Sequence, residues 1–331
     1  MSPLPTGDES LGKEFQLRVQ LAPVGNLRGG YADPYGHPPR APLGDADILE
    51  TLAAAHRYGV ERVHYRGGEP TLRPGLLRYL AHARELGYVE QALTTNGLRL
   101  PVLLPRLVDA GLTRVDIDLD SLQRERTIDL TGQDVLDTVL RAVRDSVEAF
   151  GAVEVNTLLL RENLDEIADV VAWAAGFGGR LTPRFVELST DLPGFDAEAA
   201  RTRAVSAEQA LAVLAAEFGQ PLPEAGADVI GDRECTYYRL PGSPVRFGLV
   251  AAPARPHPCR DHHGLRLGPY GELGTCRGAA VVDVRGVSLA RKCDAVRAAL
   301  TGGDPTAVTS AGAPLGRGLL LRSVPAGGRL P

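Results

Sequence analysis

The sequence is poor in several residue types and features, and each scarcity argues against one class of protein. Cysteine is absent from residues 1–234, lysine occurs only at positions 13 and 292, and the formal net charge is -5. No basic run is present, so nucleic acid is not expected as the main partner. No apolar run approaches the roughly 18–20 residues of a membrane span, and the N-terminus lacks the regions of a signal peptide. We therefore expect a cytoplasmic globular protein with no membrane partner.

The cysteines that are present lie in the last third of the chain, at positions 235, 259, 276 and 293. In a reducing compartment such clustering favours a metal site over disulfides. The alternative is a set of four unrelated buried thiols.

Apolar runs typical of strands alternate with segments of helical period from Phe15 to Leu188. Strands are expected near 15–21, 62–66, 91–94, 115–119, 153–160 and 181–188, and helices near 47–58, 74–86, 102–110, 134–150 and 165–175. This alternation predicts βαβ units with a parallel sheet, and its length fits a partial (β/α)6 TIM-type barrel. In such barrels the working residues lie at the carboxyl ends of the strands.

The character of the sequence changes after Leu188. A helix is expected at 206–218 and another at 288–300, each with a serine as N-cap, and the segments 265–267 and 272–275 flank a hairpin turn. We divide the chain into an N-terminal arm (1–14), the barrel (15–190), a C-terminal extension (191–300) and a flexible tail rich in glycine and proline (301–331).

Two successive strand ends carry residues suited to a ligand. Gly67 and Gly68 allow close backbone approach, Glu69 offers a carboxylate to an amine, and Thr95 and Asn96 end the next strand with short polar groups.

With these strand ends the sequence resembles a known family. The ordered motifs L-R-V-x-L…N-x-R, G-G-E-P-T-L-R, L-T-T-N-G and D-L-D-S-L resemble the radical S-adenosylmethionine superfamily, most closely its GTP 3′,8-cyclases, over residues 15–300. The resemblance implies S-adenosylmethionine as a cofactor. It also implies cofactor contacts from Gly67, Gly68, Glu69, Thr95, Asn96, Asp118 and Arg184.

One feature of that family is missing from this sequence. The family places a C-x3-C-x2-C motif after the first strand, and the matching positions here are Gly25, Gly29 and Ala32. Thiolates hold such clusters, so we predict that the radical-initiating cluster is absent.

A second motif of the cyclases, C-x2-C-x13-C, is kept in altered form as Cys259, His262 and Cys276. Two thiolates and an imidazole suit zinc or an auxiliary iron–sulfur cluster. Cys235, Cys293, His263, water or substrate are the candidates for a fourth ligand. The alternative is a relic site that binds no metal.

Three acids, Asp116, Asp118 and Asp120, follow one another at a spacing of two residues. On one strand face they would need a metal, a raised pKa or an arginine such as Arg66 or Arg184. Asp118, which stands where the family has a serine, is the candidate catalytic base. The alternative is that Asp120 caps a turn and Asp116 is solvated.

Substrate contacts are predicted for four further residues. Arg62 and His64 stand where the family binds a nucleotide triphosphate, Arg266 matches an arginine after the auxiliary motif, and Arg66 lies at a strand end. Histidine is a weaker cation than arginine, so we expect reduced phosphate affinity.

These observations lead to one functional hypothesis and one rival. The first is a barrel that binds S-adenosylmethionine or another nucleotide-like small molecule and performs non-radical chemistry in cofactor or specialised-metabolite biosynthesis. The rival is a non-catalytic scaffold or regulatory partner of an intact radical S-adenosylmethionine enzyme, which an exposed apolar face around residues 219–260 would support.

Overall fold

The computed structural model describes most of the chain. The described residues are 11–13, 15–27, 41–188, 197–224, 235–243, 245–251, 264–275 and 281–302. Within these segments no helix is both long and apolar enough to cross a bilayer.

The first half of the chain folds into alternating strands and helices. The strands are β1 (Gln16–Ala22), β2 (Arg62–Gly67), β3 (Glu90–Thr95), β4 (Arg114–Asp118), β5 (Val153–Leu159) and β6 (Leu181–Glu187). The helices are α1 (Asp45–Arg57), α2 (Leu76–Leu86), α3 (Leu100–Ala110), α4 (Arg124–Thr131), α5 (Leu136–Phe150) and α6 (Ile167–Ala175), with short 3₁₀ turns η1 (Pro70–Leu72) and η2 (Leu164–Glu166). Neighbouring strands from β1 to β6 pair in parallel and in sequence order, which confirms the predicted parallel sheet.

The segments after residue 190 extend this sheet at both ends. They contribute β7 (Leu222–Pro223), β8 (Cys235–Arg239), β9 (Arg246–Val250), β10 (Gly264–Leu267), β11 (Glu272–Thr275) and β12 (Val282–Asp283). β9 pairs with β6 and β10 pairs with β1, both in parallel. The sheet therefore runs from β12 to β7 as an open, curved barrel that does not close on itself. The predicted hairpin is confirmed as the antiparallel pair β10–β11.

Three further helices belong to this part of the chain, α7 (Ala197–Arg203), α8 (Ala207–Phe218) and α9 (Leu289–Thr301). The two predicted serine caps are confirmed: Ser206 forms a capping box with Gln209, and Ser288 accepts a bond from the backbone of Arg291. α9 packs beside α1, where the fully buried ammonium of Lys292 lies 2.8 Å from the Asp47 carboxylate.

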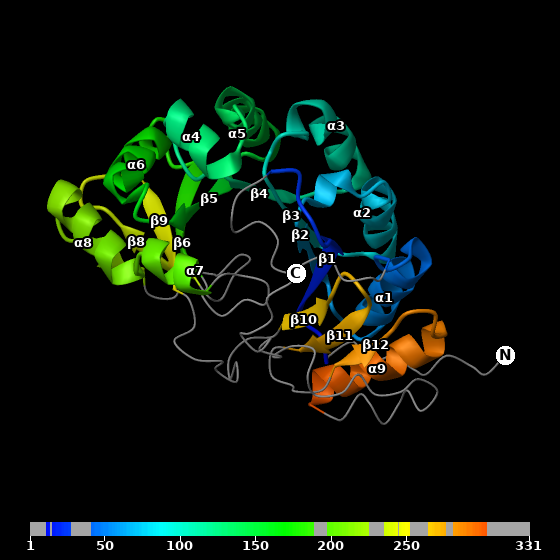
Figure 1. The fold of residues 1–331 in the computed structure, drawn as a ribbon. Coiled ribbons are helices and arrows are strands. Elements are labelled where there is room, and N and C mark those ends of the chain that lie inside the picture. Colours follow the sequence, from blue (N-terminus) through cyan, green and yellow to red (C-terminus); the bar gives the residue numbers. More distant parts are fainter. Residues whose placement is uncertain are drawn as a thin grey trace, which may run out of the picture.

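The two faces of the curved sheet differ in chemistry because side chains alternate along each strand. Odd-numbered residues of β1, β2 and β4, such as Leu17, Val63 and Ile117, are fully buried under the helices on the outer face. Even-numbered residues such as Arg62, Asp116 and Arg184 project to the inner, concave face, which Figure 1 shows inside the arc of helices. Many charged residues of the sheet therefore lie inside the barrel, whereas Gln91 and Glu187 face the helices α2 and α8.

Candidate functional site

The loop after β1 packs directly against the glycine pair that follows β2. The Gly68 N–H donates to the Ala22 carbonyl at 2.7 Å, and the Glu69 N–H donates to the Val24 carbonyl at 3.1 Å. A Cβ on Gly68 would lie 2.0 Å from the Val24 carbonyl carbon, so no other residue fits there. In this structure the glycine pair serves the contact between two loops.

Glu69 is fully buried and joins the ends of β2 and β3. Its Oε1 accepts bonds from the Thr71 N–H at 3.0 Å, the Thr71 hydroxyl at 2.5 Å and the Thr95 hydroxyl at 2.7 Å. Its Oε2 accepts from the Asn96 N–H at 2.9 Å. The predicted residues Gly67, Gly68, Glu69, Thr95 and Asn96 thus lie together, and Glu69 accepts hydrogen bonds from Thr95 and Asn96.

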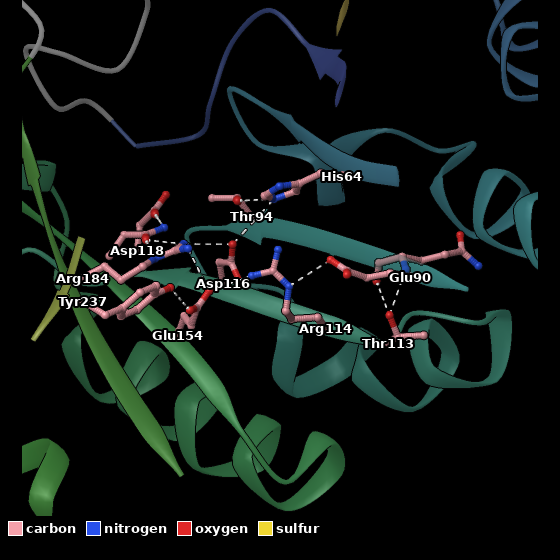
Figure 2. Close-up of polar contacts among 12 residues, drawn as sticks. His64, Glu90, Thr94, Thr113, Arg114, Asp116, Asp118, Glu154, Arg184 and Tyr237 are labelled. Carbon is pink, nitrogen blue, oxygen red and sulfur yellow. Dashed lines mark hydrogen bonds and ion pairs between the residues drawn. The ribbon is translucent and has the colours of Figure 1, made fainter. Parts of the chain in front are cut away.

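A network of buried charges crosses β4, β5 and β6 on the concave face (Figure 2). Arg184 Nη2 donates to Asp116 Oδ2 at 2.9 Å, and Arg184 Nη1 lies 2.8 Å from Glu154 Oε2. Arg114 Nη1 donates to both Asp116 Oδ1 and Glu154 Oε2 at 2.7 Å. Tyr237 donates its hydroxyl to Glu154 Oε1 at 2.5 Å. Each buried carboxylate therefore faces two guanidinium groups.

This network shows how the first of the three acids Asp116, Asp118 and Asp120 is compensated. Asp116 is fully buried and paired, so it is not solvated, and Arg184 is its partner as predicted. Asp120 lies beyond the end of β4, where its Oδ1 accepts from the Leu158 N–H at 2.9 Å. Arg114, Glu154 and Tyr237 were missed by the sequence analysis. The even positions that Arg114 and Glu154 occupy on their strands were the available signal.

Asp118 is the most accessible of the three acids: it is exposed, whereas Asp120 is half-buried and Asp116 is buried. The Asn156 amide donates to its Oδ1 at 2.9 Å, and Arg66, Asp120 and Glu69 are near enough to act on its charge. The residue is exposed, yet protein atoms crowd its carboxylate and displace part of its hydration. This desolvation raises the pKa of Asp118 from its usual 3.8 to about 7, against the lowering effect of the Asn156 bond.

Arginines gather on the concave face of the other half of the sheet. In register, Arg18 of β1 lies between Arg266 of β10 and His64 of β2, and Arg62 and Arg66 flank His64 on the same strand face. His64 is buried; its Nε2 lies 2.7 Å from the Thr94 hydroxyl and 3.7 Å from Asp116 Oδ2. The face of β10, β1 and β2 is thus cationic, whereas β4 and β5 carry the acids.

The predicted metal ligands Cys259, His262 and Cys276, and His263, lie outside the described residues. Cys235 and Cys293, the two cysteines among the described residues, are both buried. Within the described segments no group of three or more histidine, cysteine or acidic residues could hold a metal ion. Of the described part of 219–260, Leu222 is the exposed large apolar residue.

Comparisons with known proteins fit this architecture. The model of the "Radical SAM superfamily" matches residues 31–174. A GTP 3′,8-cyclase of Rhodococcus opacus is 33% identical over 273 residues, which are 78% of this chain and 74% of that protein. The chain belongs to the radical SAM superfamily. A second GTP 3′,8-cyclase, from Aquifex aeolicus, is 31% identical to this radical SAM chain over 269 residues. The match covers 78% of this chain and 81% of the Aquifex protein.

Solved structures agree with this radical SAM fold. Streptococcus suis SuiB bound to S-adenosylmethionine superposes with a TM-score of 0.56 at 12% identity, covering 83% of this chain and 64% of SuiB. At that identity the likeness concerns the fold alone, and this chain spans less than two thirds of SuiB.

Proposed function

We propose that this radical SAM family member binds a nucleotide-like small molecule on the concave face of its barrel and acts on it without a radical. The observation that carries the proposal is the loop after β1. In place of the family's first cluster ligand this loop has Gly25, and it is held by hydrogen bonds of the protein itself.

The residues of the first loop do not fit an iron–sulfur cluster. Glycine and alanine offer no side-chain donor, and residues 1–234 contain no thiol. The backbone of the loop accepts a hydrogen bond from Glu69 at the end of β2, and the Asn26 side chain accepts one from Asn96 at the end of β3. No step of the proposed activity therefore depends on a cluster at this position.

An anionic ligand group is best accommodated on the face of β10, β1 and β2. Arg18, Arg62, Arg66 and Arg266 share that face, and guanidinium groups bind phosphate and carboxylate through paired N–H donors. Arg184 lies on the other half of the sheet, where it pairs with Asp116 and Glu154. The site therefore suits a ligand with one anionic end.

S-adenosylmethionine and nucleotides both have an anionic end and hydrogen-bond donors elsewhere. Glu69, the predicted partner of the methionine amine, is buried and accepts four protein hydrogen bonds. Asn96 and Asp118 are more accessible, and we assign the ligand's donors to them. When bound, S-adenosylmethionine would supply an electrophilic methyl group on its sulfonium, which needs no cluster.

Asp118 is the residue we propose to move a proton. A base works best when its pKa lies near the working pH, and the pKa of Asp118 is raised to about 7. Its Oδ1 is engaged by Asn156, so Oδ2 is assigned to the ligand.

Calorimetric titration with S-adenosylmethionine and with GTP tests the proposal. We expect at least one of them to bind more tightly than millimolar, and R62A and R266A to weaken that binding by about tenfold. R124A is the matched control, because Arg124 lies on α4 and pairs with Asp134 at the surface. If neither ligand binds, or if R124A weakens binding as much as R62A, the proposed site is wrong.

A further inference from the structure

We propose that Arg184 and Asn156 are positioning residues that hold the Asp118 carboxylate in one orientation at the concave face. The inference rests on the proposed function, in which Asp118 meets the ligand. The three residues are partners in register on adjacent strands: Asp118 pairs with Asn156, and Asn156 pairs with Arg184. They therefore form one row across β4, β5 and β6.

The orientation of the Asn156 amide is fixed by the donors on one side of it. Arg184 donates to Asn156 Oδ1 twice, from Nε at 2.9 Å and from Nη2 at 2.6 Å. An amide has one acceptor end and one donor end. With its oxygen bound to Arg184, the nitrogen must point to the other neighbour, where Nδ2 donates to Asp118 Oδ1 at 2.9 Å.

Arg184 is itself unable to turn. Its side chain is 5% exposed, and it pairs with Asp116, which is fully buried, and with Glu154. Rotation of the guanidinium would leave these carboxylates without that partner in a poorly solvated place, which is costly. On the next strand a Cβ at Gly248 would lie 3.1 Å from Arg184 Cγ, so the glycine leaves room for the arginine side chain.

The charged groups around Asp118 explain why its carboxylate needs a fixed hydrogen-bond donor. Asp120 and Glu69 repel a charge on Asp118, Arg66 attracts it, and desolvation opposes it. The Asn156 bond favours the ionised form. Without a fixed donor, the carboxylate would keep its proton to higher pH and would be free to rotate.

The test is an NMR titration of the ligand-free protein with ¹³Cγ-labelled aspartate, in which D118N identifies the Asp118 signal. N156L removes the donor and should raise the titration midpoint of Asp118 by about one pH unit. R184K keeps the positive charge but loses the two hydrogen bonds to Asn156 Oδ1. It should raise the titration midpoint of Asp118 by a smaller amount than N156L does. In the N156L background, R184K should cause no further change, since Arg184 acts through Asn156.

Y237F is the matched control. It removes the Tyr237 hydroxyl that donates to Glu154, and so disturbs the same network without changing a contact of Asn156. It should leave the titration midpoint of Asp118 unchanged. If R184K does not fold, the hydrogen-exchange rate of the Asn156 side-chain amide in the wild type replaces it as the test. We expect slow exchange, because this amide is hydrogen-bonded at both ends.

Several results would overturn the inference: an unmoved midpoint in N156L, an equal shift in R184K and Y237F, additive effects in the double variant, or fast exchange of the amide protons. Because no ligand is present, a failure of ligand binding would count against the proposed function and leave this result standing.

Discussion

Asn96 at the end of β3 donates its side-chain amide to Asn26 Oδ1 in the loop after β1, at 2.7 Å and across 70 positions of sequence. Gln133 adds a second bond, from its Nε2 to the Asn26 carbonyl at 2.8 Å. The described part of this loop is thus anchored by protein hydrogen bonds to two other loops of the barrel.

Cysteines placed at the three positions that we match to the family's cluster motif should allow this loop to bind an iron–sulfur cluster. A Cβ on Gly25 would meet its nearest atom, the Gly68 carbonyl carbon, at an ordinary 3.6 Å. We expect G25C/G29C/A32C in a C259S/C276S background to bind about four iron atoms per chain after anaerobic reconstitution, with absorbance near roughly 400 nm. Iron and sulfide analysis with visible spectroscopy measures this.

The matched control is C259S/C276S alone, which should bind no cluster. A cluster in that control would mean that the chain holds iron without the expected thiolates, and the proposed non-radical activity would fail. Iron or zinc in the wild type that disappears in the control would belong to Cys259 and Cys276.

Removing Asp116 should destabilise the fold strongly. D116A leaves the buried guanidinium of Arg184 and that of Arg114 without one of their carboxylates. We expect the free energy of unfolding to fall by about 3–5 kcal/mol in urea titrations. D137A, which breaks the exposed ion pair with Arg124, should change it by at most about 1 kcal/mol. Equal losses in the two variants would show that the buried network adds little.

Stability should depend on pH through Asp118. Between about pH 4 and 7 the folded chain keeps a proton on Asp118 that the unfolded chain has released, since its pKa is raised from 3.8 to about 7. Raising the pH through this window therefore lowers the free energy of unfolding. We expect the free energy of unfolding of D118N, relative to that of the wild type, to increase from pH 4 to 7 and to change no further above pH 7. The increase should be modest, because solvent reaches the Asp118 carboxylate. Urea titrations at several pH values measure the difference, and a difference that is constant across this range would contradict the raised pKa.

The segment after residue 190 should be required for folding of the barrel. Residues 1–190 alone would expose the edge of β1 that β10 covers and the edge of β6 that β9 covers, and unpaired edges promote aggregation. Phe247 and Leu265, both fully buried, would also be lost. Size-exclusion chromatography and circular dichroism should find 1–190 aggregated and 1–302 folded. A folded monomer of 1–190 would show that the barrel is independent of the extension.

Much of the architecture could be predicted from local sequence patterns. Apolar alternation and helical period located β1 to β6 and their main helices, and Ser206 and Ser288 marked two helix starts. Such signals work because one chain segment carries the whole pattern. The helix α4 was missed because Arg124–Thr131 contains few apolar residues, and β8 and β9 were missed in a region rich in proline, glycine and arginine.

The sequence by itself determined the family, the absence of cysteine from residues 1–234 and the spacing of the acids. Only the tertiary structure decided what each charged group faces. Asp116 and Asp118 are two residues apart on one strand face, yet one is buried between two arginines and the other meets solvent. That difference depends on Arg184, 68 positions from Asp116. Strand register sets such partners, and local sequence pattern does not specify register between strands so far apart.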